Sequence, residues 1–180
     1  MRIKLHKTIY FIGFMGAGKT TVCRRLAKVC GCECVDVDFY IERFHGKKIS
    51  EIFDEVGESG FRKYETEALL NISKSDTPRL VSCGGGIIVT DENIKIMNST
   101  GIVIHLYSDA KNGARRISNK NTRPLFKDVR QAQKLFFQRL PKYEEAADYT
   151  VDTTRKTSGR VYHEVIDLLE EEGLIDIIES

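Results

Sequence analysis

Short apolar segments alternate along the chain with longer segments in which apolar residues recur at helical spacing. The short segments are rich in Val and Ile, as buried parallel strands are, and they predict strands at residues 8–12, 33–37, 79–83, 101–106 and 149–151. The helical spacing predicts helices at 19–29, 39–44, 49–56, 60–73, 91–97, 129–146 and 157–172. Strands that alternate with helices indicate βαβ units and a parallel sheet.

Three local signals refine this pattern. Pro141 lies inside the predicted helix 129–146, where we expect a kink or a break because proline removes a backbone donor. Gly173 follows the last helix and is a candidate for its C-cap. The segment 111–127 is polar, basic and irregular, and we interpret it as an excursion over the top of the sheet.

Length and composition indicate an ordinary globular protein. The 180 residues predict a single domain spanning 1–180, with 41% hydrophobic and 30% charged residues. A net charge of +2 gives no bulk signal for nucleic acid or for a membrane surface, and we expect neither as a partner. Residues 1–8 lack the apolar region of a signal peptide, and no apolar run approaches the length of a membrane span.

Four of the five cysteines fall within twelve residues. They are spaced as CxC rather than CxxC, and no second pair with His follows, so we interpret them as structural or incidental rather than zinc ligands. An odd number of cysteines without a secretory signal indicates a reducing compartment, and we expect a cytoplasmic protein. The cysteines are Cys23, Cys30, Cys32, Cys34 and Cys83.

Residues 13–20 read GFMGAGKT and match the phosphate-loop pattern GxxxxGK(S/T) in full, between a predicted strand and a predicted helix. Glycines let the backbone N–H groups turn inward around an anion, and the helix N-terminus behind them adds partial positive charge. Lys19 would reach the β and γ phosphates, and the Thr20 hydroxyl would hold Mg²⁺. The loop predicts a nucleoside triphosphate but does not specify the reaction.

Asp36 and Asp38 lie at the carboxyl end of the second predicted strand, where residues two apart face the same way. Ligands of open α/β sheets bind beyond this edge, so the two carboxylates could serve Mg²⁺ and an incoming hydroxyl. Asp38 could equally be the N-cap of the next helix. Because the third strand ends in glycines instead of an aspartate, Asp36 is the better candidate for holding Mg²⁺ through water.

Six sequence elements occur in one order between about residue 7 and about residue 170. They are the loop 13–21, the pair Asp36 and Asp38, Gly57-Glu58 followed by 61–65, the triplet Gly84–Gly86, Arg123-Pro124-Leu125, and Arg139 before Pro141-Lys142-Tyr143. In this order they resemble the shikimate kinase family. The phosphate loop is shared by very many proteins, whereas the combination of all six elements is highly specific.

The resemblance implies that the γ-phosphate of ATP moves to the 3-hydroxyl of shikimate, in the biosynthesis of chorismate and aromatic amino acids. We accordingly expect a three-layer fold of the P-loop NTPase type, with strand order 2-3-1-4-5 and helices on both faces of the sheet. We also expect substrate-binding helices at about 39–75, a basic lid at about 111–127, Mg²⁺ as cofactor of the co-substrate ATP, and a monomer.

The resemblance also implies roles for individual residues. The implied catalytic residues are Asp38, Lys19 and Arg123, and the implied Mg²⁺ residues are Thr20 and, through water, Asp36. The implied ATP-binding residues are Gly16, Ala17, Gly18, Lys19, Thr20, Thr21, Arg116, Arg123, Arg155 and Lys156. The implied substrate-binding residues are Asp38, Phe53, Phe61, Arg62, Gly84, Gly85, Gly86 and Arg139. Arginine suits this role because its planar fork binds a carboxylate through two parallel hydrogen bonds.

Each of these side chains also has a simpler interpretation when it is taken alone. Arg62 could pair with Glu58 one helical turn away, and Arg139 could lie on a solvated helix face. Phe53 and Phe61 could belong to the core, and 111–127 could be a solvated loop. Cys23, Cys83, Ile87 and Phe126 depart from the common family pattern without removing a charged site residue.

Other functions remain open on the residues alone. A gluconate kinase or another small-molecule kinase of the same fold is the nearest alternative, because gluconate also carries a carboxylate and hydroxyls. A nucleoside monophosphate kinase would need base-binding features that the sequence does not show. A GTPase switch would need an NKxD motif, of which 119–122 holds only the first two letters. A nucleotide-binding protein without catalysis would not need Lys19 together with Asp36 and Asp38.

Overall fold

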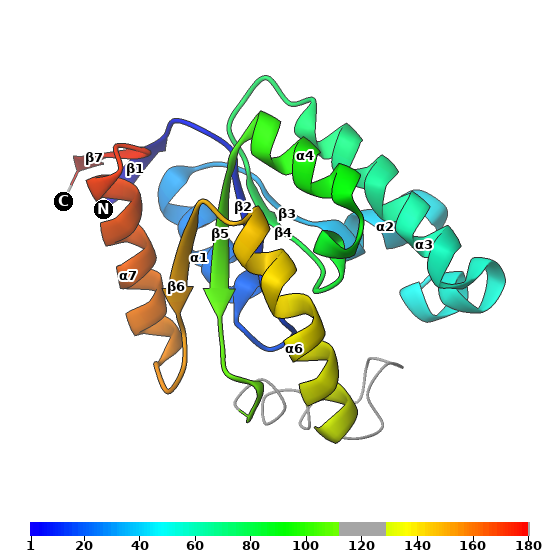
Figure 1. The fold of residues 1–180 in the computed structure, drawn as a ribbon. Coiled ribbons are helices and arrows are strands. Elements are labelled where there is room, and N and C mark those ends of the chain that lie inside the picture. Colours follow the sequence, from blue (N-terminus) through cyan, green and yellow to red (C-terminus); the bar gives the residue numbers. More distant parts are fainter. Residues whose placement is uncertain (112–128, 180) are drawn as a thin grey trace.

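The computed structural model describes residues 1–111 and 129–179, and its centre is a five-stranded parallel sheet (Figure 1). The strands lie side by side in the order β3-β4-β2-β5-β6. This is the order 2-3-1-4-5 expected from the sequence, and the α/β fold class is confirmed. The strand bounds are β2 Ile9–Ile12, β3 Cys34–Asp36, β4 Leu80–Ser82, β5 Ile102–Tyr107 and β6 Tyr149–Asp152.

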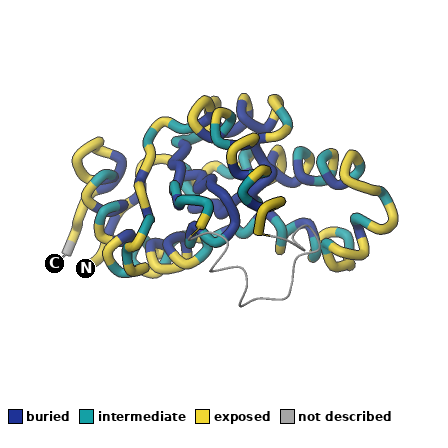
Figure 2. Tube along the Cα trace, turned by 60° about the horizontal axis from the view of Figure 1, so that its bottom comes forward, coloured by how far each residue is buried: buried dark blue, intermediate teal, exposed yellow. Residues whose placement is uncertain are grey.

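Helices cover both faces of the sheet and enclose two separate cores (Figure 1). Alternate residues of a strand point to opposite faces, so Tyr10 and Ile12 of β2 join one core while Ile9 and Phe11 join the other. Figure 2 shows the strands as the buried middle of the molecule, with exposed residues along the outer turns of the helices. Helices α1 (Lys19–Cys30) and α7 (Ser158–Glu171) cover one face; α2 (Val37–His45), α3 (Ile49–Ser73), α4 (Asp91–Thr100), α6 (Val129–Ala146) and the short 3₁₀ helix η1 (Ile87–Val89) cover the other.

Two predicted interruptions of helices differ from the structure. The predicted helices 49–56 and 60–73 form the single element α3, which is interrupted only at Gly57, where φ is 68° and ψ is −175°. At Pro141 a kink or a break was expected, and a break is wrong because α6 continues through this residue. The residues that follow Pro141 include the buried Tyr143 and Ala146, and their burial holds the last turns in place despite the missing backbone donor.

The sequence reading missed a small second sheet at the two ends of the chain. β1 (Arg2–Leu5) pairs antiparallel with β7 (Ile175–Glu179), so the termini lie close together (Figure 1). Ile3 and Leu5 alternate with charged residues and are buried in the same core as Ile175. The alternation is a strand signal, but its partner lies at the other end of the chain.

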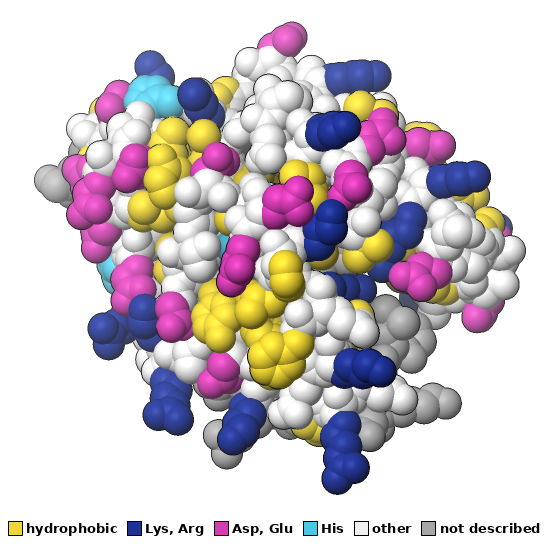
Figure 3. All heavy atoms as spheres, in the orientation of Figure 1, with side chains coloured by type: hydrophobic (Ala, Val, Ile, Leu, Met, Phe, Trp, Pro, Cys, Tyr) yellow, Lys and Arg dark blue, Asp and Glu magenta, His cyan; other side chains and the backbone are white. Residues whose placement is uncertain are grey.

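The predicted excursion 111–127 lies outside the described residues except for Lys111, and so do Arg116 and Arg123. On the face shown in Figure 3, charged side chains of both signs are interspersed, in keeping with the small net charge. Among the described residues, no helix combines the length and the apolar character that crossing a membrane requires.

Candidate active site

The phosphate loop joins the end of β2 to the start of α1. Gly13, Gly16 and Gly18 all have positive φ values, of 150°, 78° and 89°, which residues with a side chain rarely adopt. Gly18 is the N-cap of α1, so the helix N-terminus opens directly onto the loop. A Cβ atom on Gly13 would lie 2.4 Å from the carbonyl oxygen of Leu106, so β5 also requires glycine at this position.

Lys19 lies within the curve of the loop. Its side chain is buried, and its ammonium group donates to the carbonyl oxygens of Gly13 and of Phe14, the latter at 3.1 Å. The loop therefore holds a positive charge at its centre, as the phosphate-loop pattern predicts. Lysine in this place can neutralise a polyphosphate.

Thr20, Asp36 and Ser82 bring three oxygen-bearing side chains together at the carboxyl edge of the sheet. The Thr20 hydroxyl donates to Oδ2 of Asp36 at 3.2 Å and lies 3.0 Å from the Ser82 hydroxyl oxygen. The sequence analysis did not identify Ser82. This residue ends β4, the strand next to β2, where an aspartate could have held Mg²⁺. All three groups are oxygen donors of the kind that Mg²⁺ prefers.

The two aspartates have different structural roles. Asp36 is the N-cap of α2, and its Oδ1 accepts a hydrogen bond from the backbone N–H of Phe39 at 3.1 Å. The alternative that Asp38 caps the helix is therefore wrong, because the helix already begins at Val37. Asp38 lies in the first turn of α2, so strand alternation does not place it. Its Oδ1 would lie only 2.9 Å from a Cβ on Gly84.

The glycine triplet after β4 lies against the two arginines named from the sequence. A Cβ on Gly86 would lie 2.4 Å from each terminal nitrogen of Arg62, and a Cβ on Gly85 would lie 3.6 Å from Nη1 of Arg139. The triplet therefore permits the close approach of both arginines. It does so without the positive φ that glycine allows, because none of the three residues has a positive φ.

Arg62 from α3 and Arg139 from α6 are largely buried cations. The Arg62 side chain is 13% exposed and donates to Glu65 at 3.1 Å and to Glu58 at 3.4 Å. Arg139 is 7% exposed, so the alternative of a solvated helix face is wrong. Among the described residues, the Nε atoms of Arg62 and Arg139 are buried without a hydrogen-bond partner. Buried donors of this kind suit an anionic ligand.

Glu65 is a buried carboxylate in the segment 61–65, and the sequence alone predicts no role for it. It is 1% exposed and pairs with Arg62, and its Oε2 would lie 3.5 Å from a Cβ on Gly84. Burial raises the pKa of Glu65 to about 7, the Arg62 charge opposes this rise, and the Asp38 charge adds to it. Its position three residues after Arg62 and four after the buried Phe61 is the signal that could have identified it.

Tyr143 and His105 support the floor of the site. The Tyr143 hydroxyl donates to the Gly85 carbonyl oxygen, and burial raises the pKa of Tyr143 to about 12. The His105 ring stacks on Tyr143 with ring centroids 5.0 Å apart. Burial lowers the pKa of His105 to about 4, so the ring is neutral near pH 7. Tyr143 therefore fixes the backbone that the arginines flank, and His105 packs against the Tyr143 ring.

The remaining predicted residues are two aromatic residues in the core and two basic residues in the loop after β6. The Phe53 and Phe61 rings have centroids 4.6 Å apart and pack with the core, which supports the simpler interpretation of these two residues. Lys156 pairs with Glu164 at 2.7 Å, and exposed Arg155 has a φ of 56° in the loop after β6.

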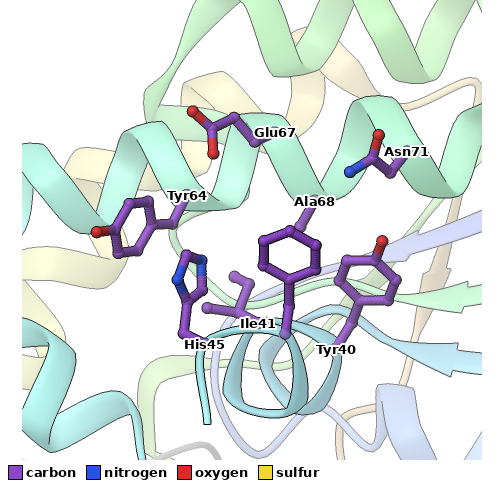
Figure 4. Close-up of a pocket in the computed structure, with 8 residues that line it drawn as sticks. Tyr40, Ile41, His45, Tyr64, Glu67, Ala68 and Asn71 are labelled. Atoms are coloured by element: carbon purple, nitrogen blue, oxygen red, sulfur yellow. The ribbon is translucent and has the colours of Figure 1, made fainter. Parts of the chain in front are cut away.

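A pocket lies between α2 and α3 (Figure 4). Aromatic rings of both helices line it, and the centroids of the stacked His45 and Tyr64 rings are 3.9 Å apart. The lining residues are Tyr40, Ile41, Phe44, His45, Tyr64, Glu67, Ala68 and Asn71. None of them is among the individual residues predicted for ATP, substrate or metal, although all of them lie within the predicted substrate-binding helices 39–75.

No group of three or more His, Cys, Asp or Glu side chains could hold a metal ion anywhere in residues 1–111 and 129–179. All five cysteines are free thiols, and their clustering in the sequence does not create a zinc site in this part of the chain. An ion held by the Thr20 hydroxyl and by nucleotide phosphates needs no such protein cage.

Gly86→Ala tests the close approach of Arg62 to the triplet. The added methyl group would displace the guanidinium, which sits at the end of a flexible side chain, so the fold should survive. We expect the thermal midpoint to change by only a few degrees and the KM for the carboxylate substrate to rise about tenfold. Steady-state kinetics and a melting curve measure both, with Gly159→Ala as control because its added Cβ meets nothing closer than 3.7 Å. An unchanged KM would contradict the arrangement.

Glu65→Gln tests the buried carboxylate. Because its pKa is about 7 in the folded protein and 4.5 ordinarily, the folded state binds more protons in that interval, and stability from this group falls as pH rises through it. We expect the stability of the variant relative to the parent to increase by up to about 3 kcal/mol between these pH values. The lowered pKa of His105 makes both proteins less stable as pH falls. Because this effect is the same in the variant and in the parent, it cancels from the difference between them. Denaturant titrations of both proteins at a series of pH values measure this difference in the free energy of unfolding. A difference that does not change with pH would refute the raised pKa of Glu65.

Comparisons with known proteins agree with this geometry. The family model described as shikimate kinase matches residues 15–170. A shikimate kinase of Bacillus anthracis is 40% identical over 167 residues, covering 92% of this chain and 99% of that protein. A shikimate kinase of Dehalococcoides mccartyi is 38% identical, with coverages of 93% and 96%. The solved structure of the Acinetobacter baumannii shikimate kinase in complex with shikimate has a TM-score of 0.88 and 34% identity, covering 93% of this chain and 95% of that one. The chain therefore belongs to the shikimate kinase family.

Proposed function

We propose that this protein transfers the γ-phosphate of ATP to the 3-hydroxyl of shikimate and releases shikimate 3-phosphate and ADP. One observation carries the proposal. Two largely buried arginines from different helices flank the Gly84–Gly86 triplet, and the Asp38 carboxylate lies at the other end of the same triplet. A substrate with a carboxylate at one end and a reacting hydroxyl at the other matches this arrangement. Shikimate is bound in the solved structure of the Acinetobacter baumannii relative.

In the proposed reaction the phosphate loop binds the ATP phosphates. Its backbone N–H groups and the N-terminus of α1 supply partial positive charge, and Lys19 adds a full one. We assign Gly16, Ala17, Gly18, Thr20 and Thr21 to the same binding site. Lys19 must leave the carbonyl oxygens of Gly13 and Phe14, at least in part, to reach the nucleotide.

The proposed Mg²⁺ ion fits the oxygen donors present. The Thr20 hydroxyl would bind it directly, and Asp36 would hold it through water, with the Ser82 hydroxyl 3.0 Å from Thr20. When bound, the ion would supply positive charge that offsets the negative charge of the phosphates. The Asp36 carboxylate already accepts from Phe39 and Thr20, which fixes its direction before any ion binds.

At the substrate end, Asp38 orients the reacting hydroxyl and accepts its proton as the phosphoryl group transfers. Arg62 and Arg139 bind the shikimate carboxylate through their forked donors, with the backbone N–H groups of Gly85 and Gly86 beside it. Glu65 positions Arg62 through their 3.1 Å pair. Phe53 and Phe61 would form the wall next to the ring.

Several parts of the proposal rest on the family alone. The region 39–75 would bind substrate, and 111–127 would act as a lid that carries Arg116 to the adenine and Arg123 to the phosphates. Closure of such a lid excludes the water that would hydrolyse ATP. Arg155 and Lys156 would complete the nucleotide site. The enzyme would work as a cytoplasmic monomer without nucleic-acid or membrane partners.

A substrate panel tests the proposal against its alternatives. Purified protein with Mg-ATP is given shikimate, gluconate or nucleoside monophosphates, and the phosphorylated product is detected directly. We expect kcat/KM for shikimate to exceed that for gluconate by about a hundredfold or more, because two buried arginines would be satisfied only by a correctly placed carboxylate. A higher kcat/KM for gluconate than for shikimate would contradict the proposal and indicate a gluconate kinase. ATP binding without any phosphorylated product would indicate a non-catalytic protein.

A further inference from the structure

Two thiols meet behind the phosphate loop, outside the proposed site. Cys23 lies in the first half of α1 and Cys34 begins β3, and their Sγ atoms are 2.8 Å apart, with the Cys34 thiol donating to Cys23. Both are free thiols. A disulfide bond is about 2 Å long, so the two sulfur atoms need to approach by less than about 1 Å to form one.

We propose that Cys23 and Cys34 form a reversible disulfide under hydroperoxides and that this cross-link lowers the turnover of the enzyme. The two thiols have complementary exposure. Cys34 is half-buried and reachable from solvent, whereas Cys23 is fully buried at 0% exposure. Cys34 is therefore the thiol that meets the oxidant, and Cys23 is the thiol that resolves the product.

The chemistry balances with hydrogen peroxide as the oxidant. The Cys34 sulfur, as thiolate, attacks one peroxide oxygen, the O–O bond breaks, and hydroxide leaves with a sulfenic acid formed on Cys34. The Cys23 sulfur then attacks the Cys34 sulfur, the S–O bond breaks, and the hydroxyl leaves as water with the Cys23 proton. In total, two thiols and one peroxide give one disulfide and two waters.

The cross-link would act on the elements that carry the proposed metal residues. Thr20 lies three residues before Cys23 on α1, and Asp36 lies two residues after Cys34 at the end of β3. Their side chains are joined by the 3.2 Å hydrogen bond, so pulling α1 toward β3 changes the placement of both. Displacements below 1 Å at a site of this kind can lower rates up to about a hundredfold.

Peptide mapping tests the bond without any substrate, so its outcome does not depend on the proposed function. Protein treated with hydrogen peroxide is alkylated to block remaining thiols and digested with trypsin and a glutamate-specific protease. Cleavage after Lys19, Arg24, Glu33 and Glu42 leaves Cys23 on peptide 20–24 and Cys34 on peptide 34–42, apart from Cys30 and Cys32. We expect peptides 20–24 and 34–42 to be joined and to separate on treatment with dithiothreitol.

Two variants complete the test. Cys32→Ser is the matched control and should still form the linked peptide, whereas Cys34→Ser should not. Peroxide should lower kcat several-fold in the parent and in Cys32→Ser, with recovery in dithiothreitol, and should spare Cys34→Ser. The proposal fails if the link joins Cys30 to Cys32 instead, if no link forms, if the linked protein turns over at the full rate, or if Cys34→Ser loses activity equally.

Discussion

Asp38→Asn is expected to lower kcat for shikimate phosphorylation by at least about a hundredfold and to leave ATP affinity unchanged. Asn keeps the size of the side chain but can neither accept the hydroxyl proton nor carry the negative charge. Asp38 lies against Gly84, at the end of the glycine triplet that we assign to the substrate, and it is not part of the loop 13–21 that we assign to ATP, so binding of ATP should persist. Steady-state kinetics and an ATP titration measure the two properties separately.

The matched control for this variant is Asp54→Asn, an exposed aspartate on α3. It makes the same chemical change outside the site and should retain full turnover. Normal turnover in Asp38→Asn would rule out the proposed role of Asp38. Loss of ATP binding together with turnover would instead assign Asp38 to the nucleotide site.

Arg139→Ala is expected to raise the KM for shikimate about a hundredfold while the KM for ATP stays within about twofold of the parent value, since removing one partner of a buried charge pair typically costs 2 to 5 kcal/mol. The side chain is 7% exposed and its Nε has no hydrogen-bond partner among the described residues, so this buried donor is available to a substrate carboxylate. Arg139→Lys keeps the charge but loses the fork, and it should lie between the parent and the alanine variant.

Lys134→Ala on the exposed face of the same helix is the control for Arg139, and it should leave both KM values unchanged. An Arg139→Ala protein with a normal melting curve and an unchanged KM for shikimate would show that this arginine does not bind the carboxylate. Equal increases in both KM values would point to a general disturbance of the sheet edge.

The fold was largely predictable because its signals are local. Each buried parallel strand and the glycine-rich loop has a sequence pattern of fewer than ten consecutive residues. The alternation of the strands with helices then limits the possible topologies. The pairing of β1 with β7 was not predictable in the same way, because its two strands come from opposite ends of the chain. The continuity of α6 through Pro141 likewise depends on burial of Tyr143, which the local pattern does not record.

The candidate site shows the same division. The phosphate loop and its lysine follow from the sequence, whereas the partners of Thr20 depend on how β3 and β4 pair. Ser82 belongs to the site because the pairing of β4 with β2 places the end of β4 beside Thr20 of α1, and this pairing is not a local feature of the sequence. The separate roles of Asp36 and Asp38 depend on where α2 begins, and helix starts are set by capping contacts such as that from Asp36 to Phe39.

The most direct test of the central claim is ADP release from Mg-ATP in a coupled assay, with and without shikimate, in the parent and in Lys19→Ala. Lys19 carries the charge at the centre of the loop. The account predicts release that depends on shikimate in the parent and is abolished in the variant. Release that is the same with and without shikimate, or no release from protein that still binds ATP, would contradict it.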